Sequence, residues 1–538
     1  MLVKTFGAAV YGIDAILVTI ETSVSLGAQF TIVGLPDTAV KESYQRVMTA
    51  TEQSGLKPPV RRTVVNLSPA DVKKEGSAFD LPIAISILGA SEMLPSARLG
   101  EFMIMGELSL DGSVLPIRGA LPMAIKAREL GFKCMIVPEA NATEAAVVNN
   151  LEVYGVRSLR QVVDLLKGDS TLEPTIVDTR AEFASALSSF DVDFSEVKGQ
   201  ETVKRAFEVA CAGGHNILLV GPPGSGKSMM AKRLPTILPP FTLAESLETT
   251  KIHSVAGRLK RGSRLMTERP FRSPHHTISP VALVGGGSNP RPGEISLAHN
   301  GVLFLDEFPE FNRQVLEVLR QPLEDRHISI SRSKYSIDYP AGFMLVASMN
   351  PCPCGYYNHP TKRCTCPPGA VARYLNRISG PLLDRIDLQV EILPVPISEL
   401  SSMEGGETSA AIRRRVIAAR EIQAARFKDS PAIHCNAQMN SRLIARFAKP
   451  DAEGARMLEE SMRRFDMSAR AYDRILKVAR TIADLDYARR GAAPSGDPAP
   501  ETLAAIAHMP ILPAHLAEAI GYRNLDRASW GTTFAPNQ

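Results

Sequence analysis

Three stretches of this sequence place charged and polar residues directly after short runs of apolar residues. The first follows the apolar residues 217–220 and reads GPPGSGKS, which matches G-x-x-x-x-G-K-[ST] at every fixed position. Its glycines allow backbone N–H groups to approach phosphate oxygens, and the amino end of the following helix attracts the same charge. We therefore predict a phosphate-binding loop after a buried strand. Its residues are Gly221, Pro222, Pro223, Gly224, Ser225, Gly226, Lys227 and Ser228.

Two side chains of this loop and two acids further along the chain could carry out phosphoryl chemistry. Lys227 would neutralise the β- and γ-phosphates of ATP, and Ser228 would bind Mg²⁺. Asp306 ends a second apolar run, residues 302–305, and would hold the same Mg²⁺ through water. Glu307 comes next and would polarise the attacking water. The sequence thus predicts an ATPase that uses Mg²⁺.

A third apolar run and a later arginine are expected to complete the site. Asn350 follows the apolar residues 343–347, so it would lie beside the γ-phosphate and position water. Arg385 lies at the expected end of a short helix, where an arginine can reach the nucleotide of a neighbouring subunit. The alternative is that Arg385 pairs with Asp384 or Asp387 in its own chain.

Four cysteines lie in one loop directly after Asn350, in the pattern C-x-C-x9-C-x-C. Four thiolates so close together can close a tetrahedral Zn²⁺ site. The spacing departs from the usual pairs of C-x2-C, so free thiols and a redox pair remain open alternatives. The candidate zinc ligands are Cys352, Cys354, Cys364 and Cys366.

Length and composition narrow the class of protein. A chain of 538 residues predicts three or four domains, and 44% hydrophobic with 22% charged residues is typical of a soluble protein. No apolar run approaches the roughly 20 residues that span a bilayer, and acids at Asp14 and Glu21 interrupt any secretory signal. The seven cysteines are an odd number and fit a cytoplasmic protein better than a disulfide framework. A net charge of +4 permits nucleic-acid binding without indicating it.

The elements that must position these residues divide the chain into four segments. Residues 1–168 alternate short strands with helices, and include a hairpin signal at Asp111-Gly112. Residues 169–192 are acidic and aperiodic and are expected to be a linker. Residues 193–395 carry the motifs above on a parallel α/β core, and residues 396–538 are expected to be helical.

The order of these motifs resembles the AAA+ ATPases of the helix-2-insert group. PGEISLAHNGVLFLDE, residues 292–307, and NPCPCGYYNHP, residues 350–360, are similar to the magnesium chelatase-like YifB/ComM family in particular, and the resemblance covers essentially the whole chain. It implies a homo-hexameric, ATP-driven motor on DNA that promotes branch migration during natural transformation, alongside recombination proteins. The alternative within the same group is a chelatase-type motor subunit that remodels a protein partner.

The resemblance also assigns a fold to the N-terminal segment. GELSLDGSVLPIRGALPMAIKARELG, residues 106–131, is similar to the part of the Lon-protease fold that carries the catalytic lysine, and Leu121 stands at the lysine position. Ala78 stands at the position of the nucleophilic serine, which implies an inactive domain with a structural or DNA-engaging role. Ser77 is one residue away, so a residual hydrolase is the alternative.

Three further features follow from the resemblance. Arg470 matches the sensor-2 arginine, which reaches the γ-phosphate from the C-terminal helical lid. Residues 328–339 resemble a hairpin that touches DNA in related helicases, with Arg332 and Lys334 near its tip. Residues 243–299 form a long insert whose cations could contact phosphates, although a solvated basic surface is the alternative for both features. The cations are Arg258, Lys260, Arg261, Arg264, Arg269 and Arg272.

Overall fold

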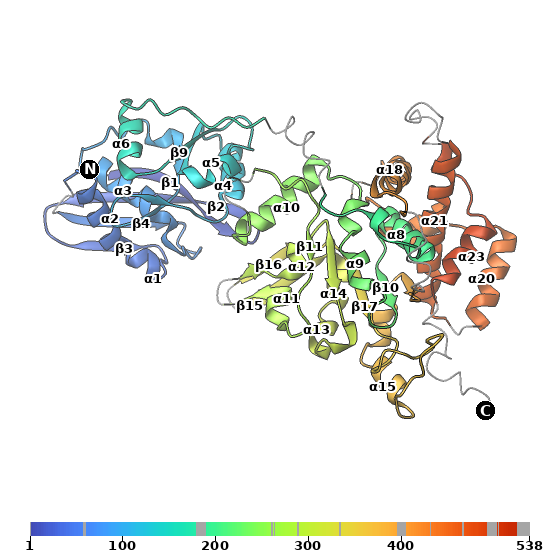
Figure 1. Cartoon of the computed structure of the whole chain (residues 1–538). Coiled ribbons are helices and arrows are strands. Elements are labelled where there is room, and N and C mark those ends of the chain that lie inside the picture. Colours follow the sequence, from blue (N-terminus) through green and yellow to red (C-terminus); the bar gives the residue numbers. More distant parts are fainter. Residues whose placement is uncertain are drawn as a thin grey trace.

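The computed structural model of the chain describes residues 2–57, 61–178, 190–259, 262, 264–287, 290–332, 335–394, 405–430, 432–464, 467–491, 503 and 505–523. These residues form three parts in chain order (Figure 1). The N-terminal part, residues 2–178, and the central part, residues 190–394, each contain a β-sheet, whereas the C-terminal part, residues 405–523, is helical. The predicted α/β class is confirmed. No helix within these ranges has both the length and the apolar character needed to cross a membrane.

The N-terminal part is built on a seven-stranded sheet in the order β3-β4-β2-β1-β5-β8-β9. Its strands are β1 (Leu2–Tyr11), β2 (Asp14–Ser25), β3 (Phe30–Val33), β4 (Arg62–Ser68), β5 (Phe102–Ile104), β8 (Cys134–Pro138) and β9 (Glu152–Val156). Helices α3 (Asp80–Ala90) and α4 (Ala120–Glu129) pack against β1 and β2, and every residue of α3 is buried. The sequence analysis did not predict β1, because its centre consists of small residues with low β-propensity.

The central part contains a five-stranded sheet in the order β11-β14-β17-β10-β18. Its strands are β11 (Phe271–Arg272), β14 (Val302–Leu305), β17 (Met344–Met349), β10 (Ile217–Val220) and β18 (Leu388–Glu391). All neighbouring pairs are parallel, so the carboxyl ends of all five strands meet at one edge. Strands β10, β14 and β17 are buried at every position, which explains why they read as continuous apolar runs.

The insert of the central part connects it to the N-terminal part. Helix α10 (Leu243–Val255) lies between the N-terminal sheet and the central sheet (Figure 1) and packs against α4. The Ser254 hydroxyl donates to the Glu144 carboxylate, and the Gly119 N–H donates to the Ser254 carbonyl at 3.2 Å. Lys251 on the same helix pairs with Asp14 at the start of β2. Three contacts of different kinds therefore join the two parts at this helix.

Two of the six insert cations proposed for phosphate binding are committed to internal contacts. Arg269 is buried and donates to the carbonyls of Pro239 and Asn300 at 2.7 Å and to the Glu245 carboxylate at 3.0 Å. Arg272 makes a two-point ion pair with Glu294, at 2.6 and 2.8 Å. These two arginines hold the insert in place. Lys260 and Arg261 lie outside the described residues.

The hairpin expected between the second and third motifs is present. Strands β15 (His327–Arg332) and β16 (Tyr335–Pro340) are antiparallel, with Arg332 opposite Tyr335. Lys334 lies outside the described residues, and so does the side chain of Arg332. The hydroxyl of Tyr11, at the end of β1, donates to the Ser336 carbonyl at 3.1 Å. The N-terminal part therefore touches this hairpin as well as α10.

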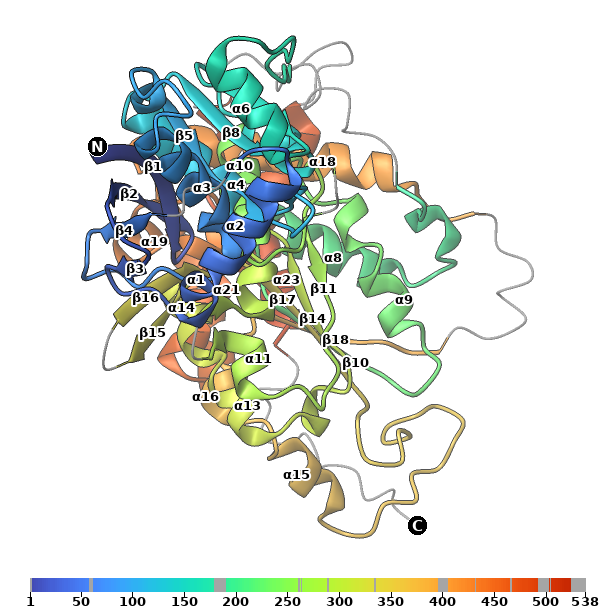
Figure 2. The same ribbon diagram turned by 90° about the vertical axis from the view of Figure 1, so that its left-hand side faces the viewer.

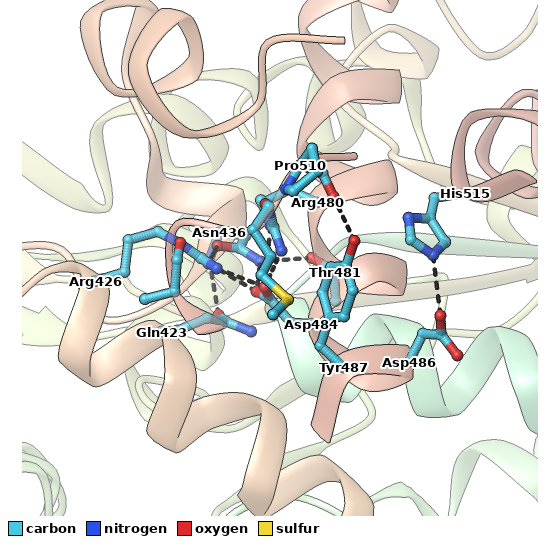
Figure 3. Close-up of polar contacts among 12 residues, drawn as sticks. Gln423, Arg426, Asn436, Arg480, Thr481, Asp484, Asp486, Tyr487, Pro510 and His515 are labelled. Carbon is cyan, nitrogen blue, oxygen red and sulfur yellow. Dashed lines mark hydrogen bonds and ion pairs between the residues drawn. The ribbon is translucent and has the colours of Figure 1, made fainter. Parts of the chain in front are cut away.

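The helices of the C-terminal part are held together by a buried network around Asp484 (Figure 3). Arg426 donates to both carboxylate oxygens of Asp484 at 2.5 and 2.7 Å, and Asn436 donates to one of them at 2.8 Å. Burial opposes ionisation of Asp484, but Arg426 and Arg480 outweigh it and lower its pKa. Removing one partner from such a buried ion pair costs about 3–5 kcal/mol, so the network fixes α18 (Ser409–Arg426) against α21 (Ala469–Gly491). This part also contains α19 (Ser441–Phe447), α20 (Ala452–Arg464) and α23 (Pro513–Gly521).

Candidate active site

The predicted phosphate loop lies between β10 and helix α9 (Lys227–Ala231), at the carboxyl edge of the central sheet. Gly221 has no room for a side chain, because a Cβ there would lie 2.6 Å from the Ile392 carbonyl oxygen. Gly226 has φ of 84°, in the left-handed region that glycine adopts without strain. The buried Ser225 hydroxyl has no hydrogen-bond partner in the described residues, so the loop offers an unused polar group to a ligand.

Lys227 is held inside this loop. Its ammonium donates to the carbonyls of Gly221 and Pro222 at 2.7 and 2.8 Å, and to the Asn350 side-chain oxygen at 3.3 Å. Burial lowers the pKa of Lys227, and Asp306 partly opposes that effect. The structure therefore brings Asn350 to Lys227 across 123 residues of sequence, because β17 and β10 are adjacent parallel strands.

Asp306 lies at the end of β14 and organises the neighbouring oxygen ligands. The Ser228 hydroxyl donates to one carboxylate oxygen at 2.6 Å, and the Ser348 hydroxyl donates to the other. Oxygen groups of this kind are the ligands that Mg²⁺ prefers, so Ser228 and Asp306 fit the metal that the sequence predicts. The sequence analysis missed Ser348. Its signal was the two-residue spacing to Asn350, which places both on the same face of β17.

Glu307 has an unusual backbone conformation and an unexpected partner. Its φ is 54°, a left-handed value that a non-glycine residue adopts at a cost of about 1–3 kcal/mol. Its side chain is 59% exposed, and its carboxylate lies 3.3 Å from His276 Nδ1. His276 follows β11 in the insert, and its ring also contacts Phe311 edge-on. The motif HHTISP was visible in the sequence, but nothing local indicated that its second histidine meets Glu307.

Arg385 is buried at the opposite edge of the central sheet. Its carbonyl accepts from Asn216 Nδ2 at 3.0 Å, and Asn216 immediately precedes β10. Its guanidinium pairs with Glu324 at 2.5 Å and donates to the Pro381 carbonyl. Neither Asp384 nor Asp387 is the partner, so the alternative considered from sequence was wrong about the residues involved.

Arg470 lies one helical turn from a contact at the amino edge of the sheet. It is exposed in the first turn of α21, one helical turn before Arg474. Arg474 pairs with Asp387, which precedes β18 at the amino edge of the sheet. Burial opposes ionisation of Asp387, but Arg474 and His215 keep its pKa well below the usual range. The structure thus brings together the groups at the carboxyl edge and leaves Arg385 and Arg470 at the amino edge.

The four cysteines after β17 converge as the sequence predicted. The Sγ atoms of Cys352 and Cys354 are 3.3 Å apart, those of Cys354 and Cys364 are 3.5 Å apart, and all four lie within 4.8 Å of one another. A tetrahedral site with Zn–S bonds of about 2.3 Å requires sulfurs about 3.8 Å apart, so this cluster fits zinc. A Cβ on Gly355 in the same loop would lie 2.5 Å from Pro223, so the cysteine loop rests on the phosphate loop.

The positions of a Lon-type serine and lysine hold no such pair here. Leu121 is fully buried in α4, and its N–H donates to the Glu144 carboxylate at 3.0 Å. Ala78 lies in a single 3-10 turn, Ser77–Phe79, and its carbonyl accepts from the Gly106 N–H at 2.9 Å. Both positions therefore serve packing and backbone hydrogen bonds.

Comparison with known proteins identifies the family of this chain. Residues 193–400 match the family described as "Magnesium chelatase, subunit ChlI". Residues 20–141 match the family "Subunit ChlI of Mg-chelatase", and residues 406–493 match the family "Magnesium chelatase, subunit ChlI C-terminal". The chain is 43% identical to "Competence protein ComM" of Haemophilus influenzae over 525 residues, which cover 97% of each protein. It is also 43% identical to "Uncharacterized protein YifB" of Escherichia coli over 96% of each.

A shorter match supports the fold of the N-terminal part. The chain is 31% identical over 99 residues to "Archaeal Lon protease" of Thermococcus kodakarensis, covering 18% of this chain and 15% of that protein. The N-terminal part is therefore Lon-protease-like, and the central part is an AAA+ domain of the magnesium chelatase type. The chain belongs to the magnesium chelatase-like family of AAA+ proteins that includes ComM and YifB.

Proposed function

We propose that this protein is an ATP-driven motor that assembles as a hexamer and moves on DNA to promote branch migration. One observation carries the proposal. The groups that would hold and attack ATP lie at the carboxyl edge of the central sheet, whereas Arg385 and Arg470 lie at its amino edge. A complete site then forms only where the amino edge of one subunit meets the carboxyl edge of the next, as a closed ring provides.

Each residue at the carboxyl edge has a role in this proposal. Ser228 and Asp306 would hold Mg²⁺, which supplies charge neutralisation on the phosphates when it is bound. Lys227 would exchange its contacts with the loop carbonyls for contacts with phosphate oxygens, and Asn350 would then orient the attacking water. Glu307 would accept the proton of that water as the water oxygen bonds to the γ-phosphorus, while the bond from the γ-phosphorus to the β-γ bridging oxygen breaks and ADP leaves with that oxygen. Arg385 and Arg470 of a neighbouring subunit would stabilise the charge that develops.

Two considerations support DNA as the polymer on which the proposed motor moves. The relative with 43% identity from Haemophilus influenzae is named a competence protein, and we take that name as support for a role on DNA in natural transformation, alongside recombination proteins. The hairpin of β15 and β16 carries Arg332 and Lys334, whose charges suit a phosphate backbone of any sequence. The proposed compartment is the cytoplasm. The second candidate function, a chelatase-type motor acting on a protein partner, rests on the family description.

The test measures ATP hydrolysis and strand exchange together. We expect branched DNA to stimulate the ATPase and the protein to migrate a model junction. The double variant Arg332→Ala/Lys334→Ala should keep basal hydrolysis and oligomer formation, but lose DNA stimulation and migration. Its control is Ser331→Ala/Ser336→Ala, which removes hydroxyls that face each other at 3.1 Å on the same hairpin without changing its charge. Stimulation by a metal-inserting partner and not by DNA would favour the second candidate.

We also propose that the cysteine cluster holds one structural Zn²⁺ per subunit. The convergence of the four sulfurs supports this proposal. Because Gly355 of the cysteine loop contacts Pro223, the bound metal would stabilise the loop against which the phosphate loop packs. The ion takes no part in the reaction. The alternative to this zinc site is that the four cysteines are free thiols.

Elemental analysis of the purified protein should find one zinc per chain. Cys364→Ser/Cys366→Ser should lose that zinc, lower the melting temperature and weaken ATP binding, because the loop under Pro223 would no longer be fixed. Cys134→Ser is the control, since this buried cysteine lies in β8 of the N-terminal part. Metal-free protein with the melting temperature and ATP affinity of the wild type would establish free thiols.

A further inference from the structure

Three arginines from distant segments meet where the N-terminal part joins the insert. Arg118 precedes α4 in the N-terminal part, Arg258 follows α10, and Arg291 begins the short strand β13 (Arg291–Pro292). All three side chains are exposed. Only Arg258 belongs to the set of insert cations that the sequence indicated, because Arg118 and Arg291 stand alone in their local sequence.

Contacts of the backbone bring Arg118 to Arg258. The N–H of Gly119 donates to the carbonyl of Ser254 at 3.2 Å, which holds the start of α4 against the end of α10. A Cβ on Gly257 would lie 2.8 Å from Arg118 Nε, so the Arg118 guanidinium rests on the backbone immediately before Arg258. Gly257 has φ of 66°, which fits a residue that must leave this space open.

Strand β13, which begins with Arg291, contacts α10, and this contact places Arg291 in the same cluster. Desolvation lowers the pKa of Arg118, and repulsion from Arg291 and from Arg258 lowers it further. In the part of the chain that the structure describes, no carboxylate forms an ion pair with any of the three arginines. Neighbouring arginines of the insert differ in this respect, since Arg269 and Arg272 are each paired with a glutamate.

The cluster is continuous with the hairpin proposed to contact DNA. Pro290 precedes Arg291 and accepts a hydrogen bond from the Tyr339 hydroxyl of β16 at 3.0 Å. α4 and α10 pack side by side above this hairpin in the view of Figure 2. The arginine cluster therefore lies beside this hairpin, at the junction of the central part with the Lon-like domain.

We propose that Arg118, Arg258 and Arg291 form a phosphate-binding site for the DNA backbone, to which the Lon-like domain contributes Arg118. Three unpaired guanidiniums held together repel one another, and a polyanion that bridges them relieves that repulsion. Backbone phosphates match because guanidinium groups bind their oxygens at two points. The proposed site gives a reason for the packing of the N-terminal part against α10, because this packing brings Arg118 to the other two arginines. The proposal rests on the proposed DNA motor function and specifies the surface that it uses.

The test compares three variants of the full-length chain. Arg118→Gln/Arg258→Gln/Arg291→Gln removes the charges, whereas the corresponding triple substitution to lysine keeps them. Arg128→Gln/Lys167→Gln/Arg456→Gln removes three exposed cations elsewhere, on α4, α6 (Leu159–Lys167) and α20. Binding of each variant to labelled duplex and four-way DNA is measured by anisotropy over about 50 to 300 mM salt, with basal ATPase activity and melting temperature as checks on folding.

Each phosphate contact contributes roughly 0.9 to the slope of log K against log salt concentration, so the glutamine triple should reduce that slope by about 2.7. Its affinity at low salt should fall by at least about tenfold, while the lysine triple and the control triple should keep slopes within about one of the wild type. A glutamine triple with the slope of the wild type overturns the assignment. Loss of nucleotide-dependent assembly with unchanged DNA binding also overturns it and makes the cluster a subunit contact.

Failure of the broader proposal gives a different result. A wild-type protein that hydrolyses ATP but binds neither duplex DNA nor four-way DNA at any salt concentration would refute the DNA motor itself. A wild type that binds DNA, with a glutamine triple that binds equally well, would refute only the arginine cluster.

Discussion

Replacing Glu307 with glutamine should leave ATP binding within about twofold of the wild type and lower kcat by about 10²–10⁴-fold, the usual contribution of a general base. Glutamine keeps the size of the side chain and can still accept a hydrogen bond from His276, which lies 3.3 Å from the carboxylate. It cannot take a proton from water. The loss should therefore appear in turnover and not in affinity, which separates this role from phosphate binding by Lys227.

The measurement needs binding and hydrolysis assayed separately on the same preparations. Glu310→Gln is the matched control, because this acid is three residues away, exposed and paired with Arg377. It should change kcat little. Normal hydrolysis by the Glu307→Gln variant would remove Glu307 from the proposed mechanism.

Replacing Arg385 with alanine should lower kcat by on the order of 10³-fold, as loss of an arginine that acts across a subunit boundary does. In the structure Arg385 is held by Glu324 and by the Pro381 carbonyl, at the edge of the sheet opposite its own phosphate loop. The Arg385 guanidinium would therefore act on the nucleotide of a neighbouring subunit. When Arg385 moves from Glu324 to the γ-phosphate in the neighbouring subunit, its guanidinium would exchange one anionic partner for another.

Mixed rings test whether the arginine acts in trans. Arg385→Ala and Lys227→Ala subunits should each be inactive alone, the second because it lacks the phosphate-binding ammonium. Mixing them creates some interfaces that contain both residues, so partial activity should return. Arg377→Ala is the control, an exposed arginine in the same segment. Co-assembled rings without recovery at any mixing ratio would argue against action in trans, and an Arg385→Ala kcat equal to the wild type would refute the role.

Several features of the site followed from the sequence because their chemistry is local. The phosphate loop needs only eight consecutive residues after a strand, and Asp306 is placed by the apolar run before it. Parallel strands present their carboxyl ends at one edge, so the sequence could place Asn350 near the nucleotide, and the adjacency of β10 and β17 then brings it to 3.3 Å from Lys227. The four cysteines were candidates for one site because they lie in one loop, and their sulfurs do lie within 4.8 Å of one another. The family and the α/β class followed from the same motifs.

The tertiary structure decided which distant residues meet. His276 reaches Glu307 from the insert, Glu324 rather than an adjacent aspartate holds Arg385, and Arg118 joins Arg258 across a contact between two parts of the chain. The resemblance assigned Arg470 to the C-terminal helical lid, and only the pairing of Arg474, one turn further along α21, with Asp387 relates it to the amino edge of the sheet. These contacts depend on side-chain direction and on how separate elements pack, which no local period encodes. A charged residue has the same local pattern whether it ends in an internal ion pair, as Arg269 does, or stays exposed for a ligand.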